Sequence, residues 1–421
     1  MTEAVAQLQK GLGSLAAVPN GPWRQQQELG LQIALATALA GTKGYSAPDV
    51  GETIAKARAL VEQIDRPEHL VLLLSGQFLF HLTRSEHRLA LSLAEHVERI
   101  GMVRNDVGAK LLGRGMSGEA YLLLGEFAVA RELLEQCHGL GDPKHRGGRA
   151  ALDPYSGLLA CLAVTTTYLG YLDQGRAQIK EALSEARRLK QAHTLAVVLQ
   201  FTNAVESITA SPELQRCSGE LMALSIEHGF PLFLGWATTF RGVSLPALGR
   251  AQEGLSQVKE GLSMVRATGN VTGTPGILIS LAAVCASVGR PIEGLNCLAE
   301  AAQIIEATEE RISEAELHRV RGELFNAMGD QTAAEQSYHQ ALAVAARQSA
   351  KVLELGAATS LTMARPRQAH GSSRSPRTDL TAGSSRASTR RSSGTPGHCS
   401  TSWRDPVFWI KIAVCGHSRG D

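Results

Sequence analysis

The chain has 421 residues, of which 44% are hydrophobic and 5% aromatic, and its formal net charge is +2. This length exceeds that of most single compact domains, so we expect several domains or a helical solenoid. A net charge this close to zero excludes a strong overall electrostatic attraction to nucleic acid or to a membrane surface.

The cysteines and the apolar runs indicate in which cellular compartment the protein is expected. Seven cysteines occur without a CxxC pair, which disfavours a disulfide framework or a zinc site and favours a reducing compartment. The most apolar run, residues 70–82, is too short to span a bilayer. The first residues lack the apolar core of a secretory signal. We therefore expect a cytoplasmic protein without a membrane segment.

Hydrophobic periodicity, broken at Gly and Pro, predicts helices from residue 2 to residue 363. A loop rich in Gly and basic residues, 139–153, interrupts the series. The expected helices are 2–17, 22–41, 48–65, 67–83, 86–100, 105–124, 127–138, 154–169, 172–190, 192–208, 211–228, 231–248, 251–268, 275–288, 291–306, 311–328, 331–347 and 350–363.

A helical hairpin repeats along this series, and residues 316–346 show it most clearly. Small residues at Gly322 and Ala334 would let two helices approach, while Phe325 and Tyr338 would fill the remaining space. The spacing is about 40 residues, although the repeat near residue 202 is degenerate. Equivalent small residues are Ala282, Gly242, Ala163 and Gly118 on first helices, with a weaker match at Phe78, and Gly294, Gly254, Gly175, Ala130 and Ala90 on second helices.

This repeat predicts an all-α, TPR-like α-solenoid of about eight or nine helical hairpins over residues 1–363. Residues 364–421 lose the periodicity and are rich in Arg, Ser and Gly, which is typical of a disordered basic tail. A nucleic-acid-binding arm is one interpretation of this tail. We favour a frameshift, because a one-base shift can turn residues 398–403 into Ala-Leu-Leu-Asp-Glu-Leu, a fragment typical of an amphipathic helix.

We find no catalytic, cofactor-binding or metal-binding constellation. Residues 41–46 contain Gly and Lys but lack the order of a phosphate-binding loop. His87 and His96 are nine residues apart, which is not the spacing of a metal-binding pair on one helix. We therefore expect a binding module and not an enzyme.

Candidate partner-binding residues follow from the hairpin, whose first helix lines the concave groove in TPR-like arrays. This geometry indicates Glu119 and Leu122 in an early repeat, and Arg319, Glu323 and Asn326 in the last. Charged groove residues can clamp a carboxylate or a basic side chain of a protein or peptide. For each residue alone, a solvated helix face is the simpler interpretation.

Two further groups have a structural and a functional interpretation. Phe233, Trp236 and Phe240 share one helical face and are typical of a core, with a ligand or peptide groove as the alternative. Cys285 and Cys297 lie on consecutive predicted helices that can approach each other, and buried packing thiols are the favoured interpretation.

Residues 30–50, 121–136, 227–242 and 314–330 together resemble the carboxy-terminal helical region of large bacterial signalling proteins. Those proteins join an adenylate/guanylate cyclase-type domain to a P-loop ATPase domain and then a TPR-like region. The resemblance covers about residues 1–363 and implies a sensory or scaffolding arm without catalytic residues. It also implies a truncated product or a split reading frame.

The expected partner is accordingly a protein or peptide in the concave groove, with no cofactor, no membrane and no nucleic acid. Two alternatives stay open. One is a cyclase or ATPase family member whose catalytic domains are missing. The other is the ligand-sensing region of a transcription regulator.

Overall fold

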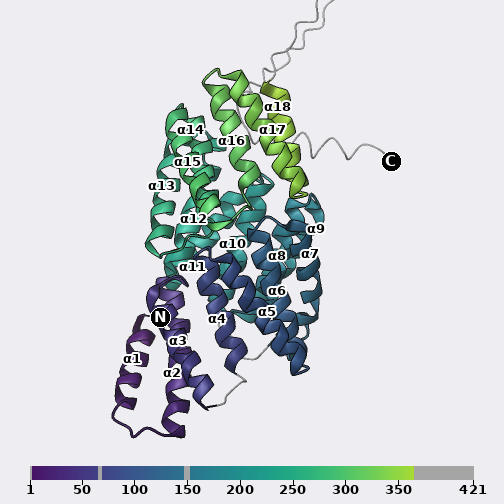
Figure 1. The fold of residues 1–421 in the computed structure, drawn as a ribbon. Helices are drawn as coiled ribbons and strands as arrows, with labels where there is room; N and C mark the ends of the chain where they lie inside the picture. Colours follow the sequence, from purple (N-terminus) through teal and green to yellow (C-terminus); the bar gives the residue numbers. More distant parts are fainter. Residues whose placement is uncertain (1, 65–68, 147–151, 365–421) are drawn as a thin grey trace, which may run out of the picture. The chain divides into compact units, whose positions relative to one another are not determined.

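The computed structural model describes residues 2–64, 69–146 and 152–364, which form one helical unit, and the interpretation of 364–421 as a tail concerns residues almost entirely outside this part. The described residues form eighteen α-helices and no strand (Figure 1). The helices are α1 Thr2–Leu15, α2 Pro22–Lys43, α3 Pro48–Ile64, α4 Leu70–Thr83, α5 His87–Val103, α6 Val107–Leu123, α7 Phe127–Glu135, α8 Pro154–Tyr168, α9 Leu172–Leu189, α10 Ala192–Ile208, α11 Leu214–His228, α12 Pro231–Ser244, α13 Ala251–Ala267, α14 Thr274–Ser287, α15 Pro291–Thr308, α16 Glu314–Ala327, α17 Gln331–Arg347 and α18 Lys351–Ala364.

Helix ends follow local chemistry, which is why most boundaries were predictable. The carboxylates of Asp106, Asp153 and Asp330 each accept a backbone hydrogen bond from the first turn of the following helix. Gly329, with φ of 84°, supplies the left-handed conformation between α16 and α17. Short polar caps and glycines of this kind are visible in sequence.

Several predicted boundaries were wrong. The helix expected at 231–248 ends at Ser244, because Pro246 lacks the N–H that a continuing helix needs, and a 3₁₀ turn follows at Pro246–Leu248. The helix expected at 127–138 ends at Glu135, and a 3₁₀ turn at Gln136–Gly141 follows it. A second 3₁₀ turn, Pro143–His145, lies within the loop expected at 139–153.

The predicted small residues do set the hairpin spacing. A Cβ added to Gly254 would lie 2.6 Å from the carbonyl oxygen of Gly242, far inside any normal contact. A Cβ on Gly175 would lie 3.0 Å from the oxygen of Ala163. In the last hairpin, the ring of Tyr338 occupies the space above Gly322. At Gly175 and Gly254 the paired helices therefore approach until backbone nearly meets backbone.

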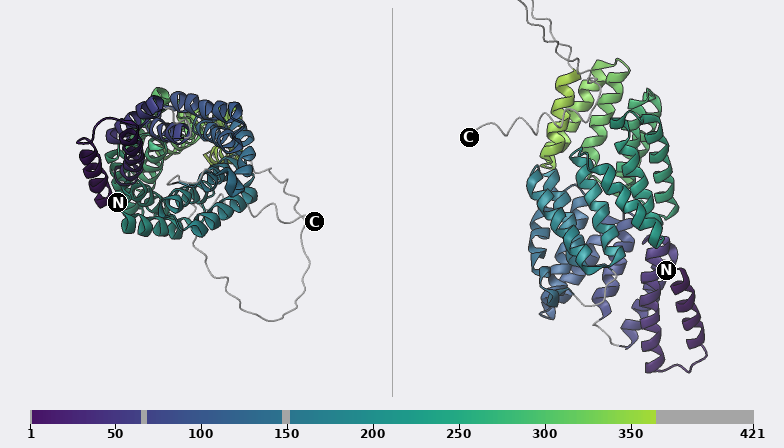
Figure 2. Two further views of the ribbon diagram at one scale, coloured as in Figure 1. Left: turned by 90° about the horizontal axis from the view of Figure 1, so that it is seen from below. Right: turned by 180° about the vertical axis from the view of Figure 1, so that it is seen from behind.

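The hairpins form two layers. Pairs from α2/α3 to α16/α17 make eight hairpins, and α18 packs on the last. Successive even-numbered helices from α4 to α18 also contact one another, whereas the odd-numbered helices pack mainly on their even-numbered neighbours. The closer spacing of the even-numbered helices makes them the inner, concave layer. Seen end-on, the helices of this unit wind around one axis (Figure 2).

A later turn of the superhelix packs directly on an earlier one. The carbonyl oxygens of Thr83 and Leu123, at the ends of α4 and α6, each accept two backbone hydrogen bonds from loops far along the chain. The N···O distances are 2.9–3.2 Å, and the donors are Val271 and Thr272 for the first oxygen and Arg311 and Ile312 for the second. The second acceptor and its donors lie one repeat after the first acceptor and its donors. The contact between the turns therefore follows the period of the solenoid, and we call this contact the seam.

A buried carboxylate lies in the seam. Glu310 has no exposed surface and accepts hydrogen bonds from the Ser85 hydroxyl at 3.1 Å and from the backbone N–H of Gly273 at 2.9 Å. The Nε2 atom of His87, also fully buried, lies 3.7 Å from the same carboxylate. Glu310 therefore joins residues of the early turn to the start of α14.

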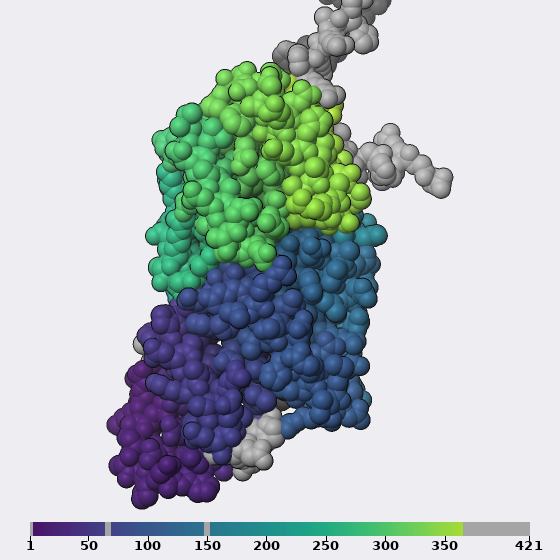
Figure 3. Space-filling view, viewed as in Figure 1, coloured from purple at the N-terminus to yellow at the C-terminus, as the bar shows by residue number. Residues whose placement is uncertain are grey.

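The seam also has an apolar part. The largest hydrophobic cluster combines residues of α6–α10 with Ala315, Val344, Ala345 and Ala350 of the later turn. Figure 3 shows the later-turn atoms, in green, lying against the earlier ones, in blue. Burial of apolar surface and backbone hydrogen bonds therefore hold the turns together.

Candidate functional site

The inner layer carries two groups of charged residues. On α16, Arg319 donates to Glu316 Oε1 at 2.6 Å, to a carboxylate oxygen of Glu323 and to the Ser360 hydroxyl of α18 at 3.3 Å. Burial lowers the pKa of Arg319, but its two carboxylate partners outweigh burial and hold that pKa above its usual value. The group has one net negative charge, and Arg319 donates four hydrogen bonds within it.

The second group is Glu119 on α6. Its carboxylate accepts a hydrogen bond from the thiol of Cys161 on α8, and within the described ranges the structure shows no cation paired with it. Burial raises the pKa of Glu119 to about 7, although the Cys161 hydrogen bond opposes this shift. Near neutral pH this inner-face carboxyl therefore takes up or releases a proton readily.

Aromatic side chains adjoin Glu119. Tyr45, in the turn after α2, donates or accepts a hydrogen bond at 3.0 Å with His193 Nε2. Burial, and to a smaller extent the charge of Glu119, raise the pKa of Tyr45. Tyr45 and half-buried Trp236 both pack against the hydrophobic cluster of α12–α16. Among these aromatic residues, Tyr45 is the one whose pKa is affected by the charge of Glu119.

His193 is neutral in this region. Its ring makes edge contacts with Phe230 and Phe233, each with a centroid separation of 5.5 Å. Burial lowers the pKa of His193 to about 4, so the imidazole adds no charge near neutrality. The charge that acts on Tyr45 therefore comes from Glu119 and not from His193.

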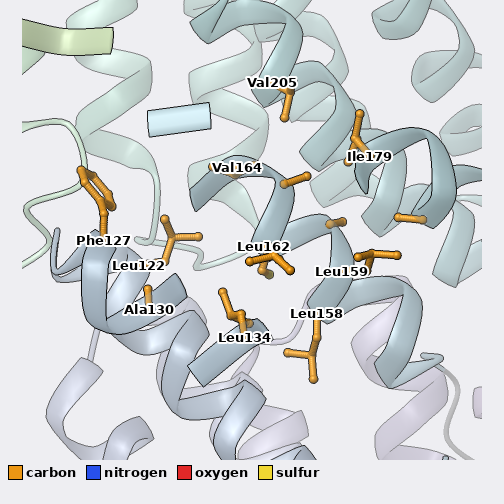
Figure 4. Close-up of a cluster of buried hydrophobic side chains, with 14 of the residues drawn as sticks. Leu122, Phe127, Ala130, Leu134, Leu158, Leu159, Leu162, Val164, Ile179 and Val205 are labelled. Carbon is orange, nitrogen blue, oxygen red and sulfur yellow. The ribbon is translucent and has the colours of Figure 1, made fainter. Parts of the chain in front are cut away.

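The structure separates the predicted partner-binding residues. Glu119, Trp236, Arg319 and Glu323 are partly exposed on inner-layer helices. Leu122 is only 2% exposed and lies in the largest core cluster beside α8, as Figure 4 shows. Leu122 is thus a core residue and not a groove residue.

The other two predicted residues lie in different surroundings. Phe233 is 4% exposed and packs in a core with Leu199 and Leu221, so the core interpretation holds for this ring. Asn326 is exposed near the end of α16 and bonds through its Oδ1 to Gln331 at 3.1 Å. Sequence reasoning missed Tyr45 and His193, because they come together only through the superhelix.

Comparison with known proteins agrees with this architecture. Residues 274–347 match the family model of the tetratricopeptide repeat, and this segment spans α14–α17. The crystal structure of a Rap protein complexed with Competence and Sporulation Factor has a TM-score of 0.60 to this chain at 14% identity, covering 82% of this chain and 94% of that one. Such a similarity shows a shared fold. The chain is thus an all-α, TPR-like α-solenoid.

A second solved structure is a signal transduction ATPase with numerous domains (STAND) that has a tetratricopeptide repeat sensor, from Pyrococcus horikoshii. Its TM-score is 0.43 at 13% identity, over 80% of this chain and 49% of that one. No curated protein sequence matches the chain.

Two features are absent from the part of the chain that the structure describes. None of its helices combines the length and apolar character that crossing a membrane requires. Its His, Cys, Asp and Glu side chains form no group of three or more that could hold a metal ion.

Proposed function

We propose that the chain is a non-catalytic, cytoplasmic interaction module that binds a cationic segment of a protein or peptide on its inner face. The observation that carries the proposal is the Glu119 carboxyl, which lies on an inner-layer helix without a cationic partner among the described residues. A carboxylate that has lost part of its solvation gains from a cation that replaces it.

The neighbouring groups support a cation as the ligand. Aromatic faces such as that of Tyr45 attract ammonium and guanidinium groups. The Arg319 group adds a further net negative charge to the inner layer. A Lys or Arg side chain in an extended peptide fits this chemistry, and an anionic segment does not.

The biological role we propose is regulation of a nucleotide-handling signalling protein. The sequence resemblance to the carboxy-terminal arms of bacterial cyclase/ATPase proteins supports this role. The Rap protein of similar fold was crystallised in complex with Competence and Sporulation Factor, which is consistent with ligand binding on a solenoid of this kind. ATP-dependent thermal stabilisation of the isolated chain would favour an enzyme instead.

Selection from a peptide library tests the binding site. A pentapeptide library with every residue varied is incubated with the wild type, with Glu119→Gln and with Glu260→Gln on the outer helix α13, and the retained peptides are sequenced by mass spectrometry. We expect Arg or Lys to be enriched with the wild type and Glu260→Gln, with roughly tenfold weaker binding to Glu119→Gln. Binding should tighten from pH 6 to pH 8 as Glu119 loses its proton.

Equal enrichment of cationic residues by the wild type and Glu119→Gln would contradict the site. Enrichment of acidic peptides by the wild type would contradict the ligand class.

A further inference from the structure

Cys285 and Cys297 lie together within one hairpin. Cys285 on α14 has no exposed surface, and Cys297 on α15 is partly exposed at the edge of the same hydrophobic cluster. The two helices approach closely here, since a Cβ on Gly294 would lie 3.1 Å from the carbonyl oxygen of Ala282. The two side chains are hydrogen-bonded, thiol to thiol.

We propose that Cys285 and Cys297 form a reversible disulfide when the protein meets a peroxide, so that this hairpin is an oxidation site. The pair connects a partly exposed thiol, which an oxidant can reach, with a buried thiol on the neighbouring helix. That arrangement is the one in which an initial oxidation product is captured by a second cysteine.

The two cysteines take different roles. The hydrogen bond from Cys285 lowers the pKa of Cys297, whereas the same bond and burial raise the pKa of Cys285. Of the two thiols, Cys297 is therefore the one that loses its proton more readily, and its partial exposure makes it the nucleophile. Cys285 is the resolving thiol.

The chemistry balances with hydrogen peroxide as the oxidant. The Cys297 thiolate attacks one peroxide oxygen, forming an S–O bond and breaking the O–O bond, and the departing hydroxide takes up a proton to become water. The Cys285 sulfur then attacks the sulfenic sulfur, forming the S–S bond and releasing the second oxygen as water. Two thiols lose two electrons in total, and the peroxide gains them.

The other described cysteines provide an internal contrast. Cys137 and Cys161 are buried, and burial raises the pKa of Cys137 to about 12 and that of Cys161 well above its usual value. Cys217 is also buried, and burial raises its pKa. These three thiols should stay reduced at a peroxide dose that links Cys285 to Cys297.

Digestion without reductant tests the proposal. The full chain is treated with peroxide, denatured, alkylated and cut after glutamate, which separates fragments 261–293 and 294–300 and places one cysteine on each. We expect these fragments to stay joined after peroxide and to separate after reduction, in the wild type and in the control Cys217→Ser. Separate fragments with both thiols alkylated, or with Cys297 oxidised to sulfinic acid, would overturn the proposal.

A second measurement identifies the order of events. In Cys285→Ala the sulfenic acid of Cys297 should persist and be trapped by dimedone, whereas in Cys297→Ala no dimedone adduct should form on Cys285. Thermal unfolding of each variant checks that it is folded. A dimedone adduct on Cys285 but not on Cys297 would overturn the assignment of roles.

Discussion

The side chain that links structure to function is Glu119, because its environment and not its identity makes it unusual. A glutamate on a helix face is ordinarily ionised at neutral pH, yet burial here raises its pKa to about 7. Ionisation of Glu119 in the folded protein is therefore unfavourable. A cationic ligand would relieve that charge, so the same residue that destabilises the free protein favours the complex.

This cost predicts how stability depends on pH. A carboxyl whose folded pKa lies above its unfolded value weakens the fold as pH rises from about 4.5 to about 7, because the unfolded chain ionises first. Glu119→Gln removes this pH dependence. Relative to the wild type, the free energy of unfolding of the variant should therefore increase by on the order of 2–3 kcal/mol between pH 5 and pH 8. Chemical denaturation at both values, with Glu260→Gln as the control, measures the gain. If the difference in free energy of unfolding between variant and wild type does not change with pH, the environment assigned to Glu119 is wrong.

At the scale of the element, the two helices of a hairpin can approach closely because their interface contains residues without side chains. Side chains are absent at Gly242 and Gly254, where the backbones of α12 and α13 meet. Tyr338 shows the complementary solution, in which a large ring fills the space that Gly322 leaves. Both patterns were visible in the sequence, because each hairpin must repeat them to stack on its neighbours.

A single methyl group should therefore disrupt a hairpin. Gly254→Ala places a Cβ against the carbonyl oxygen of Gly242, and α12 and α13 must move apart. We expect a loss of about 2–4 kcal/mol in the free energy of unfolding. The matched control is Gly219→Ala on α11, where an added Cβ meets no atom within 4 Å and should be neutral or slightly stabilising. If both variants unfold alike, close helix approach is not what the repeat encodes.

Sequence and structure agree wherever the determining contacts are local. Helix limits depend on caps and glycines a few residues away, and hairpin packing on residues about one helix apart, so both were predictable. Leu122 was misplaced because an inner-layer helix also packs against the helices beside it, and the repeat pattern does not reveal which side of the helix faces a neighbour. Tyr45 with His193, and Ser85 with Glu310, pair across superhelical turns, which no local pattern encodes.

At the scale of the whole helical unit, the seam gives a stack of hairpins a defined inner face. An array in which each repeat touches only its neighbours could flex along its length. Here Thr83 and Leu123 bond to later loops, and Glu310 satisfies donors from both turns. The inner face that carries Glu119 is therefore held by contacts that lie far away in sequence.

Hydrogen exchange at the seam tests the central claim, that these hairpins close into one superhelix. Glu310→Ala leaves Ser85 and the Gly273 N–H without their acceptor, at a cost of about 2–4 kcal/mol. The control Glu309→Ala removes only an exposed pair with Arg88. We predict that Glu310→Ala, and not Glu309→Ala, speeds exchange of the amides of Val271, Thr272, Arg311 and Ile312 while the hairpin helices stay protected. Fast exchange at these amides already in the wild type would contradict the closed superhelix.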